Sequence, residues 1–258
     1  MKTMKTSGTD VDSYKNICEL FVSDDDKFRT FRNSSHAYNW VLEHVTFPLG
    51  QKYLEEILSG GERPAALFEW ARKNDMVGSP KVHNYGRYGV FSPTTLRYLK
   101  VLTDIEESFD INEDTRIVEI GGGYGGQCRL IKDYFKVKNY SMIDLPVVLK
   151  LQEKYLKRFD INDVHYYEKP EDFDGQIIDL VISNFAFNEL APSVQWDYFE
   201  HIVSRAKMGY ISGRWLGGSA KGCAHAVLKK RMNATVKSYT PLTTNNNVNI
   251  IWGNKKNN

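Results

Sequence analysis

Apolar and polar residues follow different patterns in the two parts of the chain. Before residue 110, apolar residues recur at three- and four-residue spacings, which is typical of amphipathic helices. Helices are expected over 11–21, 37–45, 49–58, 65–73 and 93–107. At the start of the last one, Ser92 can cap the helix and Pro93 suits its first position. Leu96, Leu99 and Ile105 share one face of this helix with Leu102, and we expect that face to pack on a sheet.

From Asp114 onward, short β-branched runs alternate with helical patterns. Strands are expected at 116–120, 140–143, 164–167, 177–183, 208–212, 236–239 and 248–252, and helices at 127–135, 146–159, 194–205 and 220–232. This alternation predicts an α/β protein whose parallel sheet is covered on both faces. Residues 240–247 alone separate the last two strands, which is too short for a helical crossover. These two strands should therefore form an antiparallel hairpin.

Residues 116–128 combine a short strand, a glycine-rich turn and the start of a helix. Glycine tolerates positive φ and lets the backbone approach a ligand closely, and the amides at the start of a helix are free to bind it. Gly121, Gly123 and Gly126 match the dinucleotide fingerprint G-x-G-x-x-G. Asp144 follows at about the twenty-residue distance expected of a ribose-binding acid. The stretch thus predicts a nucleotide site.

The same stretch also matches E-x-G-x-G-x-G, through Glu119, Gly121, Gly123 and Gly125. This is the first motif of S-adenosylmethionine-dependent methyltransferases. A dinucleotide-binding sheet is typically parallel throughout. The predicted C-terminal hairpin and the long helical segment before the turn therefore favour the methyltransferase interpretation.

Composition and charge make several classes of protein unlikely candidates. With 41% hydrophobic and 26% charged residues, the chain resembles soluble globular proteins. A net charge of +2 gives no electrostatic reason to expect a nucleic-acid partner. No apolar run reaches the ~20 residues of a membrane span, and no apolar segment follows the basic N-terminal residues as in a signal peptide. We therefore expect a cytoplasmic protein.

The cysteines predict neither a disulfide frame nor a zinc site. Cys18, Cys128 and Cys223 are far apart and show no C-x-x-C spacing, so reduced thiols are expected. Cys128 follows the glycine turn closely, and we expect it to have a packing role. No tight cluster of Asp and His is visible in the sequence, so no metal ion is expected.

Further motifs extend from about residue 75 to residue 253. They are Val-Gly-Ser-Pro at 77–80, Ser-Pro-Thr-Thr-Leu-Arg-Tyr-Leu at 92–99, Val-Glu-Ile-Gly-Gly-Gly-Tyr-Gly-Gly-Gln at 118–127, Ile-Asp-Leu-Pro at 143–146, Ile-Ser-Asn-Phe-Ala-Phe-Asn-Glu-Leu at 182–190, Met-Gly-Tyr-Ile at 208–211 and Asn-Val-Asn-Ile-Ile-Trp-Gly at 247–253. With these motifs the chain resembles a bacterial family of sugar O-methyltransferases, which are class I S-adenosylmethionine-dependent enzymes.

The resemblance implies a fold and a reaction. The fold would be a Rossmann-like sheet of seven strands with the C-terminal hairpin, an N-terminal helical extension or lid over 1–110, and an S-adenosylmethionine-binding domain over 111–258. The reaction would transfer a methyl group to a hydroxyl of a small-molecule sugar, such as a nucleotide-linked sugar or a precursor of a capsule or lipopolysaccharide glycan. A homodimer stays open.

The methyltransferase interpretation assigns cofactor-binding roles to residues around the strand ends. Asp144 would accept hydrogen bonds from the ribose hydroxyls, Glu119 would brace the glycine loop, and Tyr124 and Gln127 would shape the methionine pocket. Asp172 and Phe173 would contact the adenine. The full expected set is Glu119, Gly121, Gly123, Tyr124, Gly125, Gln127, Asp144, Leu145, Asp172, Phe173, Asn184 and Phe185.

A sugar hydroxyl is a poor nucleophile until a general base takes its proton. Glu189 follows the fourth strand, whereas His83 and His225 have the better intrinsic pKa, so all three are candidate bases. We expect the acceptor pocket between the irregular segment 81–91 and the loop 184–190. Its expected binding residues are Asn84, Tyr85, Arg87, Tyr88 and Asn188.

Three alternative functions remain open at this point. They are methylation of another small metabolite, a catalytically silent cofactor-binding scaffold, and a nicotinamide-dependent oxidoreductase. Calorimetry that compares S-adenosylhomocysteine with NAD separates the last of these from the others.

Overall fold

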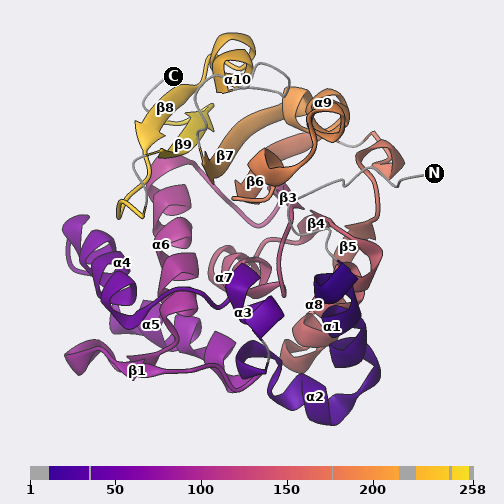
Figure 1. Cartoon of the computed structure of the whole chain (residues 1–258). Coiled ribbons are helices and arrows are strands. Elements are labelled where there is room, and N and C mark those ends of the chain that lie inside the picture. The colour runs from indigo at the N-terminus through magenta and orange to yellow at the C-terminus, as the bar shows by residue number, and fades with distance from the viewer. Residues whose placement is uncertain (1–11, 35, 176, 215–224, 244–245, 256–258) are drawn as a thin grey trace.

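The centre of the protein is a sheet of seven strands in the order β5-β4-β3-β6-β7-β9-β8 (Figure 1). The computed structural model describes residues 12–34, 36–175, 177–214, 225–243 and 246–255. The strands are β3 (Arg116–Ile120), β4 (Asn139–Ile143), β5 (Val164–Tyr167), β6 (Ile178–Asn184), β7 (Ala206–Arg214), β8 (Thr235–Ser238) and β9 (Asn247–Trp252). Strands β3 to β7 pair in parallel, and β9 is antiparallel to both β7 and β8. This is the class I methyltransferase arrangement, so the predicted fold class and the C-terminal hairpin are confirmed.

Alternate residues of the strands belong to two separate hydrophobic clusters. Ile117 and Tyr140 belong to the first cluster, which also contains residues of α6, α7 and α8 and the buried free thiols Cys18 and Cys128. Val118 belongs to the second cluster, together with residues of α9 and α10. Successive side chains of a strand point to opposite faces, so helices cover both faces of the sheet. These helices are α7 (Gly126–Phe135), α8 (Pro146–Leu156), α9 (Pro192–His201) and α10 (His225–Arg231).

Helices also form most of the chain before the sheet. They are α1 (Asp12–Ser23), α2 (Asp25–Arg29), α3 (His36–Val41), α4 (Phe47–Ser59), α5 (Ala65–Arg72) and α6 (Pro93–Ser108). Short 3-10 turns lie at η1 (Phe31–Asn33), η2 (Lys73–Met76), η3 (Gly86–Tyr88), η4 (Lys157–Phe159), η5 (Pro170–Asp172), η6 (Phe187–Glu189) and η7 (Val203–Arg205). Cys223 and the first part of the helix expected over 220–232 lie outside the described residues. Among the described residues, no helix is long and apolar enough to cross a membrane.

Helix α6 connects the N-terminal helices to the sheet. The Ser92 hydroxyl caps it by accepting a hydrogen bond from the Thr95 amide at 3.3 Å, and Pro93 occupies its first turn. Its apolar face, Leu96, Leu99, Leu102 and Ile105, is buried in the first cluster, as the residue spacing predicted. Helix α6 contacts α4, α5 and α7, so it lies between the N-terminal helices and the sheet domain.

A buried polar network holds the N-terminal segment against the glycine turn. The Arg32 guanidinium donates to the Asp75 carboxylate at 3.0 Å and to the Ser92 hydroxyl at 2.9 Å. The Asn74 amide donates to the carbonyl of Gly126 at 3.1 Å. Since each charge in the network is paired, its burial is tolerated. The first hydrophobic cluster also contains residues from both sides of position 110, and the division into domains there stays a prediction.

The segment 81–91, expected to be irregular, forms a small ribbon. Its strands β1 (His83–Asn84) and β2 (Val90–Phe91) pair antiparallel, and η3 lies between them. The His83 ring stacks on Phe47 of α4 at 4.9 Å between centroids, and Tyr88 packs on Phe68 of α5 at 5.1 Å. These contacts hold the ribbon beside α4 and α5.

Candidate functional site

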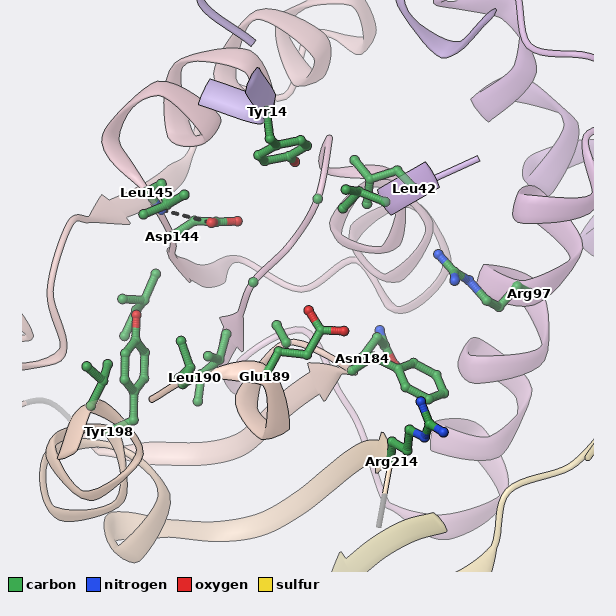
Figure 2. A pocket seen from close by; sticks show the side chains of 18 of the residues that line it. Tyr14, Leu42, Arg97, Asp144, Leu145, Asn184, Glu189, Leu190, Tyr198 and Arg214 are labelled. Atoms are coloured by element: carbon green, nitrogen blue, oxygen red, sulfur yellow. Dashed lines mark hydrogen bonds between the residues drawn. The ribbon is translucent and has the colours of Figure 1, made fainter. Parts of the chain in front are cut away.

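A cavity of about 880 Å³ opens at the carboxyl ends of the central strands. Ile120, Ile143 and Asn184, the last residues of β3, β4 and β6, belong to its lining. Ligands of open α/β sheets bind at this edge, and typical ligand pockets enclose roughly 300 to 1,000 Å³. Figure 2 shows Asp144 and Leu145 at one end of the cavity, Arg97 and Arg214 at the other, and Glu189 between them. The cavity is the candidate active site.

The glycine turn forms one wall of the cavity. Gly121 and Gly123 belong to the lining and have positive φ values of 73° and 59°, which side chains other than glycine rarely adopt. A Cβ at Gly121 would overlap the Cβ of Ala186 in the loop after β6. Gly125 also has positive φ, 94°, and precedes α7, but it does not belong to the lining. The turn therefore needs glycine for its backbone shape and for the close approach of the neighbouring loop.

Asp144 lies directly after β4 with its carboxylate toward the cavity (Figure 2). This carboxylate accepts hydrogen bonds from the Leu145 amide and from the Gln152 side chain, each at 2.8 Å. Gln152 also donates to the carbonyl of Gly123 at 3.1 Å, so it ties the acid to the glycine turn. Desolvation raises the pKa of Asp144 to about 7. An ionised carboxylate has about four acceptor sites, so Asp144 can still accept bonds from two ribose hydroxyls.

Glu119, Tyr124 and Gln127 lie behind the turn, outside the cavity lining. Glu119 is fully buried, accepts a hydrogen bond from the Tyr140 hydroxyl at 2.8 Å, and has its pKa raised to about 7 by desolvation. Tyr124 packs edge-on against Tyr155 with 4.8 Å between ring centroids. Gln127 is fully buried, and its amide has no hydrogen-bond partner among the described residues. The structure therefore places these three residues where they can support the turn rather than touch a ligand in the cavity.

The loop after β5 presents different residues to the cavity from those expected. Asp172 is exposed and does not belong to the lining, and Phe173 is buried against Tyr167 with 5.3 Å between ring centroids. Glu168 and Glu171 belong to the lining instead. Glu168 is the first residue after β5, so the rule that selects Asp144, an acid directly after a parallel strand, could have identified it.

The loop after β6 supplies the central part of the cavity. The Ser183 hydroxyl donates to the carbonyl of Ile120 at 3.1 Å and accepts from the Phe187 amide at 3.0 Å, which fixes the loop against β3. Asn184 and Phe185 belong to the lining. The Asn184 amide group is buried and has no hydrogen-bond partner among the described residues, so a ligand in the cavity could satisfy it.

Glu189 ends η6 and projects into the middle of the cavity (Figure 2). The residue as a whole is exposed, but partial desolvation by the cavity walls raises the pKa of its carboxyl group above the ordinary value. No described residue forms a hydrogen bond or an ion pair with this carboxylate. A carboxylate with a raised pKa and no fixed partner is suited to accept a proton.

The other expected acceptor residues lie away from this cavity. His83, Asn84 and Tyr85 are in or beside the β1–β2 ribbon, and none of them belongs to the lining. Arg87 and Tyr88 belong to a second cavity of about 680 Å³ beside α5. The structure does not bring segment 81–91 together with loop 184–190, because its aromatic side chains pack on α4 and α5.

Two further candidates are also outside the lining or outside the description. Asn188 packs under β7, where a Cβ at Gly213 would overlap its side chain. His225 begins α10, and its side chain lies outside the described residues. Within the described part of the chain, no group of three or more His, Cys, Asp and Glu side chains is placed to hold a metal ion.

Several lining residues were not expected from the sequence. Tyr14 of α1, His44, Arg97 of α6, Tyr198 of α9 and Arg214 of β7 come from elements that are distant in the chain. Arg97 had one usable signal, because it is the charged residue within the predicted motif at 92–99. The others carry no local pattern that marks them as lining residues.

Solved structures with a similar arrangement are methyltransferases by name. The structure of M. capricolum TrmK with its cofactor product S-adenosyl-homocysteine has 13% identity, covers 55% of this chain and 62% of its own, and has a TM-score of 0.41. The mitomycin 7-O-methyltransferase MmcR has 13% identity, covers 60% of this chain and 56% of its own, and has a TM-score of 0.44. A SAM-dependent methyltransferase from Aquifex aeolicus has 15% identity, covers 60% of this chain and 87% of its own, and has a TM-score of 0.44.

The matched part is less than two thirds of the TrmK and MmcR chains. No protein-family model and no curated protein matches this chain. The fold class therefore rests on the strand order and pairing, and the reaction has to be inferred from the residues of the cavity.

The lining satisfies the requirements of a nucleoside-containing cofactor. Asp144 offers free acceptor sites for a ribose, Gly121 and Gly123 leave room beside the turn, and Glu168 and Glu171 offer acceptors near the adenine end. The unpaired amide of Asn184 adds a donor and an acceptor farther along the cavity. These residues fit S-adenosylmethionine, and the ribose acceptor alone also fits a nicotinamide cofactor.

Proposed function

We propose that the protein is an S-adenosylmethionine-dependent O-methyltransferase that acts on a sugar hydroxyl, in a nucleotide-linked sugar or a precursor of a surface glycan. One observation carries the proposal. Asp144, beside the glycine turn, and Glu189, with a raised pKa, face the same cavity at the carboxyl ends of the strands. The cavity therefore contains both a ribose acceptor and a candidate base. The sequence resemblance to sugar O-methyltransferases supports the choice of acceptor.

Bound at this site, S-adenosylmethionine would supply an electrophilic methyl group on a positively charged sulfur. Asp144 would hold the ribose, and the backbone around Gly121 and Gly123 would lie against the methionine part. Glu189 would accept the proton of the sugar hydroxyl while the new carbon–oxygen bond forms and the carbon–sulfur electron pair stays on sulfur. Holding the reacting groups in line can contribute roughly 7 to 11 kcal/mol, and a general base typically adds about a hundredfold or more.

A nicotinamide-dependent oxidoreductase is the competing function that shares the ribose acceptor. Calorimetry separates the two functions. We expect S-adenosylhomocysteine to bind the protein and NAD not to bind measurably. Binding of NAD without binding of S-adenosylhomocysteine would refute the proposal.

The role of Glu189 is tested by Glu189→Gln, which keeps the size and the acceptor oxygen of the side chain but removes the base. With a panel of nucleotide-linked sugars and mass-spectrometric detection of methylated product, we expect kcat to fall by about a hundredfold or more. S-adenosylhomocysteine affinity should be nearly unchanged. His83→Ala is the matched control, because His83 does not belong to the cavity lining. A Glu189→Gln variant with the wild-type rate would show that Glu189 is not the base.

A further inference from the structure

Arg97 is a largely buried cation that lacks a carboxylate partner among the described residues. Its Nε is fully buried without a hydrogen-bond partner, and its guanidinium lies 5.3 Å from the centroid of the Tyr98 ring. The fully buried arginines Arg32 and Arg129 are different, because each of them forms an ion pair with at least one carboxylate. Arginine keeps its charge in proteins, and an unpaired buried charge is unfavourable. Arg97 projects into the cavity, so a ligand there can supply the missing anion (Figure 2).

A second arginine lies at the same end of the cavity. Arg214 is the last residue of β7, and the part of the chain that the structure describes contains no ion-pair partner for it. His44 also belongs to the lining, and burial together with the charge of Arg97 lowers its pKa to about 4. His44 is therefore neutral at physiological pH and adds no negative charge. This end of the cavity is positive, whereas Asp144 and Glu168 make the opposite end acidic.

We propose that Arg97 and Arg214 bind an anionic group of the acceptor, a phosphate or a carboxylate carried by the sugar. The proposal rests on the function proposed above and narrows its substrate class. Guanidinium groups bind both kinds of anion through paired N–H donors in a fixed planar geometry. The acidic end binds the positively charged cofactor, and the positive end binds the acceptor.

The placement of Glu189 gives this arrangement a consequence for the reaction. Glu189 lies between the acidic end and the arginines (Figure 2). An acceptor held by its anionic group at Arg97 and Arg214 extends its sugar toward Glu189 and the cofactor. The anionic group therefore aligns the hydroxyl for transfer, and a neutral sugar lacks this anchor.

Binding is tested with defined probes in the presence of saturating S-adenosylhomocysteine. Calorimetry with glucose 1-phosphate, UDP-glucose, glucuronic acid and glucose compares the phosphate, the carboxylate and the neutral sugar. We expect at least one anionic probe to bind about tenfold or more tightly than glucose, as charged hydrogen bonds do. Preference for glucose 1-phosphate or UDP-glucose identifies phosphate as the anion, and preference for glucuronic acid identifies carboxylate. Equal binding of glucose and all three anionic probes, or no binding of any anionic probe, overturns the inference.

The arginines are tested by Arg97→Met and Arg214→Met, which keep much of the apolar stem and remove the charge. Each should weaken the anionic probe by about tenfold or more while S-adenosylhomocysteine affinity stays unchanged. Arg87→Met is the matched control, because Arg87 belongs to the second cavity. Wild-type binding of the anionic probe by both cavity variants overturns the inference.

Two further measurements separate this inference from the proposed function and from misfolding. Because Arg97 has no carboxylate partner to be left unpaired, Arg97→Met should keep or raise the melting temperature. Probe binding that depends on the arginines, without methyl transfer to any acceptor, supports the anion site and refutes the proposed reaction. Methyl transfer to neutral sugars at the same kcat/KM as to anionic sugars supports the reaction and overturns the anion site.

Discussion

The buried carboxyl group of Glu119 predicts an unusual dependence of stability on pH. Glu119 is 1% exposed, and the hydroxyl of Tyr140 is its hydrogen-bond partner in the structure. Desolvation raises its pKa from 4.5 to about 7, with a contribution from Asp144, while the Tyr140 bond opposes the shift. The change we consider is Glu119→Gln, which retains an oxygen that can accept from Tyr140 but cannot ionise.

The sign of the effect follows from proton linkage. The folded protein binds a proton at Glu119 more tightly than the unfolded chain does. The stability due to this group is therefore fully present below pH 4.5 and is lost as pH rises to about 7. One pKa unit corresponds to about 1.4 kcal/mol, so the loss amounts to about 3 kcal/mol. Glu119→Gln removes this loss, and the variant should become more stable than the wild type by about that amount above neutral pH.

Urea unfolding of both proteins at about pH 5 and about pH 8.5 measures the effect, because the transition midpoint reports the free energy of unfolding. Asp144 titrates in both proteins, so the quantity of interest is the difference between them at each pH. Tyr140→Phe is a useful control, since it removes the bond that favours the ionised form and should steepen the loss. Equal differences at both pH values would refute the reasoning, because Glu119 would then have an ordinary pKa in the folded protein.

Two further predictions concern the cofactor end of the cavity. Asp144→Asn should weaken S-adenosylhomocysteine binding by about tenfold or more in calorimetry, because the charged acceptor for the ribose hydroxyls is lost; unchanged affinity would show that Asp144 does not hold the ribose. Gly123→Val should yield a protein that folds, with a cooperative thermal transition, but does not bind S-adenosylhomocysteine, because φ at Gly123 is 59° and a Cβ there would lie 3.0 Å from Leu42. Normal binding by this variant would contradict the assignment of the glycine turn.

Local patterns in the sequence were sufficient to predict the sheet. The strand at 116–120 matches β3 residue for residue, and the short connection at 240–247 predicted the antiparallel pair of β8 and β9. These features depend on side chains that are neighbours in the chain, on backbone periodicity and on turn length. Asp144 and Glu189 could be selected in the same way, because each follows a predicted strand, and the structure places both at the cavity.

The composition of the rest of the cavity was decided by tertiary structure. Tyr14, Arg97 and Arg214 lie far apart in the chain, and they meet only because α1 packs on α8 and α6 packs beside the sheet. Arg97 adjoins the buried face of α6, so the rotation of that helix against its neighbours determines whether the arginine reaches the cavity. For His83 and Arg87 the same kind of packing gave the opposite result, since aromatic contacts with α4 and α5 hold their ribbon away from the site. Sequence periodicity specifies which face of an element is apolar, but the docking of one element on another specifies which polar side chains share a cavity.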